Sequence, residues 1–270
     1  MDHPFISVVV TVKNEERHIA DLLDSLIIQE EPFEVIIIDA ASEDRTQHIV
    51  REYIKQYGEE KIRLRQYAAQ RGESRNLGIK MARGEVVAFT DGDCIANPNW
   101  LKGMRATLRD YDIAAGKTIN IGYKPFEELG RVELFYRGYD ITYPSANLAY
   151  WRYVLDDIGG FDPIFVTAED IDLNFRAVKA GYTIGYNPRA IIYHRARSTF
   201  LGFFKQAFWN GFGRKQLTLK HGKLWGNYNV GRMLDREFTF WYTVRLVVAL
   251  MGYFTCKFFG GSRYKPRPEE

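Results

Sequence analysis

The stretch VVAFTDGDCIANPNW, residues 86–100, carries an apolar run directly into two aspartates. Its first half has the composition of a buried strand, and Gly92 separates Asp91 from Asp93 where that strand ends. Two carboxylates so close together repel each other unless a cation neutralises them. A few hard oxygen ligands suit Mg²⁺ or Mn²⁺ carried with a substrate phosphate. The stretch therefore predicts a strand that ends at a metal site, where Gly92 lets the backbone approach a ligand closely.

The residues before this strand alternate between strand and helix patterns. FISVVVTV (5–12) and FEVIIIDA (33–40) are continuous apolar runs, as expected of strands covered on both faces. KIRLRQY (61–67) predicts another strand, an apolar stripe over 19–27 predicts a helix, and a short helix is expected around 74–82. The alternation predicts an α/β fold, an open and mostly parallel sheet flanked by helices.

Ligands of such sheets bind beyond the carboxyl ends of the strands. This rule places residues 11–15, Asp39 and residues 91–93 along one edge. No G-x-G-x-x-G follows the first strand and no G-x-x-x-x-G-K-[ST] occurs, so neither a dinucleotide fold nor a P-loop is indicated. Arg71 and Arg75 precede the metal strand, and guanidinium groups suit pyrophosphate oxygens. The ordinary alternative for Arg75 is an exposed helix residue.

A second acidic cluster lies in FVTAEDIDLNFRAVKAGY, residues 165–182. Glu169, Asp170 and Asp172 stand at the expected start of a helix, where the helix dipole favours ionised carboxylates. Acidic residues are ordinarily enriched in first turns, so helix capping is the alternative for all three. His194 closes the next strand, AIIYH, and a neutral imidazole is a better ligand for Mn²⁺ than for Mg²⁺.

Taken in order along residues 5–195, these segments resemble the inverting glycosyltransferases of family 2, which have the GT-A fold. The resemblance is carried by ISVVVTVKNEERHIADLLDSL, VIIIDAASEDRT, RGESRNLGI, FTDGDC, GGFDP, AEDIDLNFRAVKAGYTIGYNP and the strand ending in His194. It implies transfer of one sugar from a nucleotide-sugar donor, a UDP-sugar, to an acceptor hydroxyl with inversion. The acceptor is lipid-linked, a glycan or a small molecule.

The resemblance also assigns roles to residues of this chain. Nucleotide-sugar contacts are implied for Thr11, Val12, Asn14, Glu15, Asp39, Arg71, Arg75, Asp91 and Gly92. Metal ligands are implied at Asp91, Asp93 and His194, the catalytic base at Asp170 and an acceptor contact at Glu169. This chain has Lys13 where many relatives have a small or aromatic residue, so the resemblance is weaker for the contact with the nucleotide base. The Q-x-x-R-W motif of processive synthases is absent at Gln206, which favours one sugar per encounter.

The residues after 198 have a different character. TFLGFFKQAFWNGFGRKQLTLKHGKLWG (199–226) mixes aromatic with basic residues, as helices in a membrane interface do. Residues 238–260 are long enough to span a bilayer, but Arg245 and Lys257 interrupt them, which argues against a spanning helix. We predict a catalytic domain, 1–197, with a nucleotide-binding half (1–95) and an acceptor half (96–197). Residues 198–270 form a helical, aromatic-rich extension for a membrane surface (198–260) or a homo-oligomer, the alternative being a core helix over the acceptor cleft.

Composition excludes several classes of protein. The chain has 270 residues, and 37 basic against 34 acidic residues leave a net charge of +3, too slight to indicate a nucleic-acid partner. Two cysteines cannot build a disulfide framework, and the first residues lack the basic region of a signal peptide. We expect a cytoplasmic protein, peripheral on the cytoplasmic face of the membrane.

Two other functions fit the sequence less well than sugar transfer. A sugar-phosphate nucleotidyltransferase needs a loop rich in glycine and arginine after the first strand, and TVKNEERH has no glycine. A non-catalytic sugar- or lipid-binding relative on a membrane would have lost Asp170 or the paired aspartates, and both are present.

Overall fold

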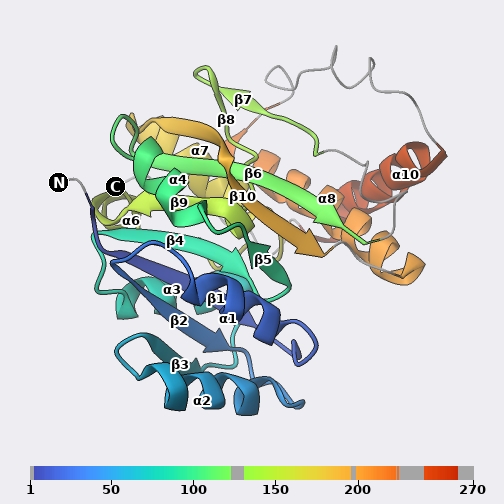
Figure 1. The fold of residues 1–270 in the computed structure, drawn as a ribbon. Helices are drawn as coiled ribbons and strands as arrows, with labels where there is room; N and C mark the ends of the chain where they lie inside the picture. Colours follow the sequence, from blue (N-terminus) through green and yellow to red (C-terminus); the bar gives the residue numbers. More distant parts are fainter. Residues whose placement is uncertain (1–2, 123–130, 196–198, 223, 225–239, 261–270) are drawn as a thin grey trace.

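A mixed sheet of eight strands forms the centre of the molecule, with helices on both of its faces (Figure 1). The computed structural model describes residues 3–122, 131–195, 199–222, 224 and 240–260. The strand order is β3-β2-β1-β4-β9-β6-β10-β5. The expected α/β sheet flanked by helices is therefore confirmed.

The first half of the chain builds the parallel part of this sheet. Its elements are β1 (Ile6–Val12), α1 (Ile19–Ile27), β2 (Phe33–Asp39), α2 (Thr46–Tyr57), β3 (Ile62–Gln66), α3 (Arg71–Met81) and β4 (Val86–Asp91). β1 pairs in parallel with both β2 and β4, and β3 pairs in parallel with β2. The carboxyl ends of β1, β2 and β4 consequently lie at one edge, as the sequence predicts.

The second half adds strands in both directions. Its elements are β5 (Cys94–Ala96), α4 (Trp100–Thr107), β6 (Ile113–Ile121), β7 (Phe135–Tyr136), β8 (Tyr139–Asp140), η1 (Ser145–Asn147), β9 (Leu148–Trp151), α6 (Arg152–Ile158), α7 (Glu169–Ala180) and β10 (Ile184–Arg195). β9 lies antiparallel between β4 and β6, and β5 is antiparallel to β10. β6 and β10 pair in parallel with a shift of register between Asn187 and Ile191.

Two apolar layers hold the helices against the sheet. One contains Leu22 of α1, Val50 of α2 and Trp100 of α4, all fully buried. The other packs α3, α6 and α7 on the opposite face, for example through Val154 and Leu173. Because both faces are covered, the strands show the continuous apolar runs that revealed them in the sequence.

Helix α3 begins earlier than the sequence predicts. The expected start was near residue 74, but the helix starts at Arg71, where Glu73 Oε2 accepts the Gln70 N–H at 3.2 Å. This reciprocal capping satisfies backbone donors of the first turn and moves the start forward. Arg71 and Arg75 therefore lie one turn apart on the same face of one helix.

The C-terminal helices α8 (Phe200–His221) and α10 (Phe240–Thr255) lie side by side, and a short π-helix, Cys256–Gly260, follows α10 (Figure 1). They touch through glycine: a Cβ on Gly211 would lie 1.7 Å from the Ala249 carbonyl oxygen, and one on Gly252 would lie 1.9 Å from that of Phe208. The predicted boundary at residue 197 falls outside the described residues.

Residues Phe240–Phe259 are long and apolar enough to cross a membrane by length and composition alone. Only 17% of their most apolar window is buried, which is unlike the core helix of a soluble protein. These residues therefore meet the length and composition criteria for a membrane span. The charges of Arg245 and Lys257 argue against such a span.

Candidate active site

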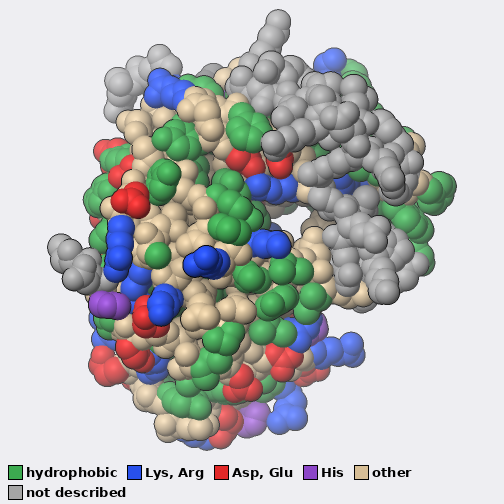
Figure 2. Space-filling view, turned by 45° about the horizontal axis from the view of Figure 1, so that its top comes forward, with side chains coloured by type: hydrophobic (Ala, Val, Ile, Leu, Met, Phe, Trp, Pro, Cys, Tyr) green, Lys and Arg blue, Asp and Glu red, His purple; other side chains and the backbone are tan. Residues whose placement is uncertain are grey.

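A large pocket opens at the carboxyl ends of the strands, with a volume of about 1870 Å³. It is larger than a site for one drug-sized ligand, about 300–1,000 Å³, so it has room for two substrates. Figure 2 shows a hollow beside the C-terminal helices with lysine and arginine side chains next to it. The pocket is lined by these predicted site residues: Thr11, Val12, Asn14, Glu15, Arg71, Asp91, Gly92, Asp93, Glu169, Asp170 and His194.

Two predicted residues, Asp39 and Arg75, lie behind the pocket wall. Asp39 is fully buried and accepts hydrogen bonds from the Ser42 N–H at 3.0 Å and from Gln47 Nε2 at 2.8 Å. These bonds stabilise the turn between β2 and α2. The sequence places Asp39 at the correct edge, but its carboxylate accepts hydrogen bonds from the loop after β2 and from α2.

Arg75 links the two acidic clusters from within the protein. Its side chain is 2% exposed and donates to Glu169 Oε1 at 2.6 Å and to Asp91 Oδ1 at 2.9 Å. Burial raises the pKa of Asp91, but the charges of Arg75 and Arg71 outweigh burial and hold that pKa below its usual value. Arg75 is therefore not an exposed helix residue, because it joins Asp91 at the end of β4 to Glu169 of α7.

Arg71, one turn earlier, has a different environment. Its guanidinium is 55% exposed in the pocket and lies 3.9 Å from Glu169 Oε1. That distance is an ion pair without a close hydrogen bond. Arg71 is thus oriented by Glu169 and keeps donors for an anion in the pocket.

Asp170 lies at the start of α7, after Ala168, whose φ of 63° is left-handed. The Ser145 N–H donates to Asp170 Oδ2 at 3.2 Å and the Ile171 N–H donates to Oδ1 at 2.8 Å. Burial and the neighbouring charge of Glu169 raise the pKa of Asp170 to about 6, against the opposing effects of Arg75 and the two N–H donors. A carboxylate with this pKa is ionised at neutral pH and more basic than usual, which suits a general base.

Asp172 is set apart from its neighbours by its partners. It is fully buried and accepts from Lys220 Nζ at 2.6 Å, His221 Nε2 at 2.7 Å and Arg176 Nε at 2.8 Å. Burial opposes ionisation, but these donors lower the pKa of Asp172 to about 2. Asp172 therefore joins α7 to the end of α8 and faces away from the pocket.

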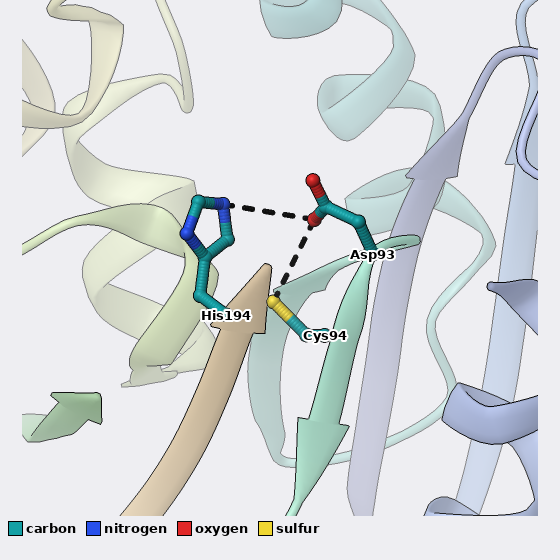
Figure 3. Close-up of side chains that lie close together, drawn as sticks. All are labelled: Asp93, Cys94 and His194. Atoms are coloured by element: carbon teal, nitrogen blue, oxygen red, sulfur yellow. Dashed lines mark hydrogen bonds and ion pairs between the residues drawn. The ribbon is translucent and has the colours of Figure 1, made fainter. Parts of the chain in front are cut away.

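Asp93 and His194 meet with a third donor atom that the sequence reasoning missed (Figure 3). Asp93 Oδ1 lies 3.6 Å from His194 Nε2 and 3.9 Å from Cys94 Sγ, and the three atoms lie within 4.8 Å of one another. The predicted approach of Asp93 and His194 is observed, whereas Asp91 Oδ1 is bonded to Arg75. The signal for Cys94 was its position next to Asp93, but the partner strand was not readable from the sequence.

Gly92 is needed for packing within the site. A Cβ at this position would lie 2.9 Å from Val12 Cγ1 and 3.0 Å from Glu15 Cγ. The absent side chain therefore lets the end of β1 and the loop after it pack onto the loop after β4. This is a close approach between two parts of the protein itself.

Other pocket residues carry no recognisable motif. They include Arg131 and Tyr143, where the Arg131 guanidinium lies 4.2 Å above the ring centre, and Asn210 and Arg214 of α8. These residues come from a connecting segment and from the C-terminal helix, where chain order predicts no position relative to the sheet. They extend the pocket on the side away from β1.

Comparisons with known proteins agree with this architecture. Glycosyl transferase family 2 matches residues 7–162, and glycosyl transferase family group 2 matches residues 86–260. The glycosyltransferase AglE of Haloferax volcanii is 27% identical over 228 residues, which cover 79% of this chain and 74% of AglE.

Solved structures share the fold. The mannosyltransferase PcManGT of Pyrobaculum calidifontis, in complex with GDP-Man and Mn²⁺, has a TM-score of 0.64 at 18% identity, covering 94% of this chain and 75% of its own. Residues 1–349 of Staphylococcus aureus TarS, in complex with UDP-GlcNAc, have a TM-score of 0.60 at 20% identity, covering 94% and 73%. In sequence, the match covers 39% of this chain and 19% of TarS, a poly(ribitol-phosphate) β-N-acetylglucosaminyltransferase. Since the family 2 match alone spans more than half of the residues, the chain belongs to glycosyl transferase family 2.

Proposed function

We propose that this protein transfers one sugar from a nucleoside diphosphate donor to an acceptor hydroxyl, with inversion at the anomeric carbon. The observation that carries the proposal is that one pocket collects an exposed arginine, Arg71, a carboxylate beside a histidine, Asp93, and a basic carboxylate, Asp170. Diphosphate binding, metal binding and deprotonation of a hydroxyl need these three kinds of group.

The donor side is formed by the ends of β1 and β4. Thr11, Val12, Asn14 and Glu15 line it, together with Lys13, which the sequence marked as a departure. We infer a UDP-sugar donor, which is supported by the UDP-GlcNAc bound in the TarS structure, while PcManGT binds GDP-Man. Arg71 would contact the diphosphate with the guanidinium donors that Glu169 leaves available.

A divalent metal, Mn²⁺ or Mg²⁺, fits the side chains of the site. Asp93 and His194 would hold it, since their oxygen and nitrogen atoms approach to 3.6 Å beside the pocket. When bound, such an ion stabilises the negative charge of a leaving diphosphate. The complex of PcManGT with Mn²⁺ supports the assignment of a metal.

Asp170 performs the proton transfer in this proposal. Its Oδ atoms accept hydrogen bonds from two backbone N–H groups, which fix the carboxylate at the pocket wall. As the acceptor oxygen forms its bond to the anomeric carbon, Asp170 takes the hydroxyl proton and the bond to the diphosphate oxygen breaks. One displacement at the face opposite the leaving group inverts the configuration. Glu169 orients Arg71, and a direct contact of Glu169 with the acceptor stays a prediction.

The C-terminal helices suggest where the reaction takes place. Residues at the start of α8, on α10 and on the π-helix that follows leave large apolar side chains exposed: Phe200, Leu201, Phe204, Phe240, Val247, Leu250, Met251, Phe254, Phe258 and Phe259. Residues from α8 and α10, Ala207 and Leu250 among them, line the pocket. We propose that this apolar surface rests on the cytoplasmic face of a membrane, with the sheet on the aqueous side. An acceptor that is lipid-linked would then enter from that surface, and a glycan or small molecule from solution.

Replacement of Asp170 by asparagine tests the central step. The Asp170→Asn side chain keeps the size and loses the basicity, so kcat should fall by about a hundredfold to ten-thousandfold, with nucleotide affinity little changed. Sugar transfer, nucleotide binding and the anomeric configuration of the product are measured with purified full-length protein and a panel of nucleotide sugars.

Asp172 is unsuitable as the control because it is buried in ion pairs. Asp156→Asn is the matched control, since Asp156 is 62% exposed and lies outside the pocket. Transfer at near wild-type rate by Asp170→Asn would show that another group accepts the proton.

A further inference from the structure

The metal-binding part of the pocket contains a thiol that the proposed function does not use. Cys94 is fully buried at the start of β5 and is paired directly with His194 of β10. His194 is paired in turn with Asn120 of β6. Residues directly opposite each other on neighbouring strands project from the same face, so the thiol, the imidazole and the amide form one row across three strands.

The row determines which histidine nitrogen is available. The amide oxygen of Asn120 faces His194 Nδ1 at 3.3 Å, so Nδ1 carries the proton that is donated to it. In the neutral ring Nε2 then presents a lone pair to the Asp93 carboxylate, 3.6 Å away. Two lone pairs directed at each other repel, and either a proton on Nε2 or a metal ion between the two atoms removes this repulsion. A histidine whose other nitrogen donates to an oxygen is the usual arrangement of a metal ligand.

The spacing of the donor atoms suits one small cation. Bond lengths of about 2.0 Å for oxygen and nitrogen and about 2.3 Å for sulfur place tetrahedral ligands of zinc about 3.3–3.5 Å apart. The distances from Asp93 Oδ1 are 3.6 Å to Nε2 and 3.9 Å to Sγ, and no pair of the three exceeds 4.8 Å. Figure 3 shows the three side chains directed toward one space between β5 and β10. Small adjustments of the side-chain torsions would therefore bring all three donor atoms to one ion.

We propose that Cys94 is the third protein ligand of the metal, in the place that the sequence assigned to Asp91. The oxygen, nitrogen and sulfur donors of Asp93, His194 and Cys94 form a site that binds borderline-soft divalent cations such as Co²⁺ and Zn²⁺ more tightly than Mg²⁺. The thiol proton leaves to solvent when the sulfur–metal bond forms. This inference rests on the proposed function only in taking Asp93 and His194 as metal ligands.

Three protein ligands leave a coordination position open, as in catalytic and unlike structural zinc sites. Asp93 and His194 line the pocket, whereas Cys94 is fully buried, so a metal held by these three side chains would be reached from the pocket. Asp91 Oδ1 accepts a hydrogen bond from Arg75 Nη2 at 2.9 Å, so this oxygen is already engaged. The thiol thus sets which metal binds, while the open position remains for a donor phosphate.

Cobalt titration of the full-length chain, kept reduced, tests the thiol directly. A thiolate bound to Co²⁺ gives a charge-transfer absorption in the near ultraviolet, which oxygen and nitrogen ligands do not give. We expect this band in wild-type protein and in Cys256→Ser, the control that removes the other cysteine. Cys94→Ser should lose the band and bind Co²⁺ at least about tenfold more weakly. Removing a hydrogen-bond partner of a metal ligand already weakens metal binding by about that factor, and removing a ligand should weaken it at least as much.

Asp93→Asn and His194→Gln keep the thiol and remove its neighbours, so both should weaken the band. They also keep the test decisive if Cys94→Ser fails to fold, which circular dichroism reports. A wild-type protein without the band, or an unchanged band in Cys94→Ser, overturns the proposal. Binding of nucleotide sugar with Mn²⁺, measured by calorimetry on the same proteins, is separate: if it persists without the cobalt band, the proposed function stands and the thiol ligand is wrong.

Discussion

Burial changes what an arginine can do, and the first two turns of α3 show both cases. Arg71 is 55% exposed and belongs to the pocket, whereas Arg75, one turn later, is 2% exposed and bonded to Asp91 and Glu169. The sequence presents both as candidates for a diphosphate. Only the structure separates the arginine that faces the pocket from the arginine that positions acids behind it.

Substitution of these two arginines should separate stability from binding. Arg75→Met leaves two carboxylates in or near the interior without their cation, which should cost about 3–5 kcal/mol of unfolding free energy. Arg71→Ala should change that free energy by less than about 0.5 kcal/mol and weaken nucleotide-sugar affinity. Urea unfolding and calorimetry measure the two quantities. Equal destabilisation by both variants would contradict the assignment.

The pH dependence of transfer should report Asp170. Because its pKa is raised to about 6, the carboxylate is protonated and inactive as a base below that value and ionised above it. Below pH 6, kcat/KM should fall about tenfold per pH unit, and above it the acid limb should level off. The profile is measured over about pH 5 to 8, and a flat profile there would exclude Asp170 as the base.

At the scale of elements, α7 is held from two sides. Arg75 of α3 bonds its first residue, Glu169, and Lys220 and His221 of α8 bond Asp172 one turn further on. A Cβ on Gly213 of α8 would lie 2.7 Å from the Thr167 carbonyl oxygen and 3.0 Å from Ala168 Cβ, so α8 also packs on the residue before the helix. The position of Asp170 therefore depends on α3 and α8 together.

The ion pairs of Asp172 with Arg176, Lys220 and His221 form a clamp on α7 that should affect acid unfolding. The pKa of Asp172 is lowered to about 2, below the usual value of 3.8, so the ionised side chain stabilises the fold above pH 4 and this stabilisation is lost as the pH falls toward 2. The contribution is about 2 kcal/mol. Asp172→Asn should show a correspondingly weaker loss of unfolding free energy across that interval, measured by urea denaturation at fixed pH values. Parallel curves for wild type and variant would contradict the clamp.

The elements that the sequence predicts are those whose patterns are local. Apolar runs revealed β1, β2 and β4, and the edge rule placed Asp91 and Asp93 correctly. The antiparallel strand β9 was not predicted, because its four residues, LAYW, are too short to show a period. The proximity of Cys94 to His194 depends on the pairing of β5 with β10, which are nearly a hundred residues apart. Burial of Arg75 depends on the same kind of distant contact.

At the scale of the whole molecule, the C-terminal helices present an exposed apolar face. Helix α10 carries Val247, Leu250, Met251 and Phe254 at helical spacing, and the π-helix that follows carries Phe258, all exposed. Hydrophobic side chains gather at the right-hand edge of Figure 2, on the side of the C-terminal helices. A contiguous apolar face of this kind on a soluble surface marks an interaction site.

Charging that face should detach the protein from membranes. Met251→Glu combined with Phe254→Glu places two acids on the exposed stripe, where transfer from the interface to water becomes favourable. Co-sedimentation with anionic vesicles should be lost, while nucleotide binding is unchanged. Wild-type protein that does not sediment with vesicles and instead forms a dimer, which the double variant dissociates, would assign the stripe to a second copy of the chain.

The contact of Gly213 with Thr167 and Ala168 bears on how this protein could be recombined with its relatives. A chimera joined at the start of α8 would bring a foreign side chain against Ala168, the left-handed residue that precedes α7. A junction after His221 would retain both that contact and the ion pairs to Asp172. We therefore expect a chimera to fold and to keep the position of α7 only when α8 comes from the same parent as the sheet.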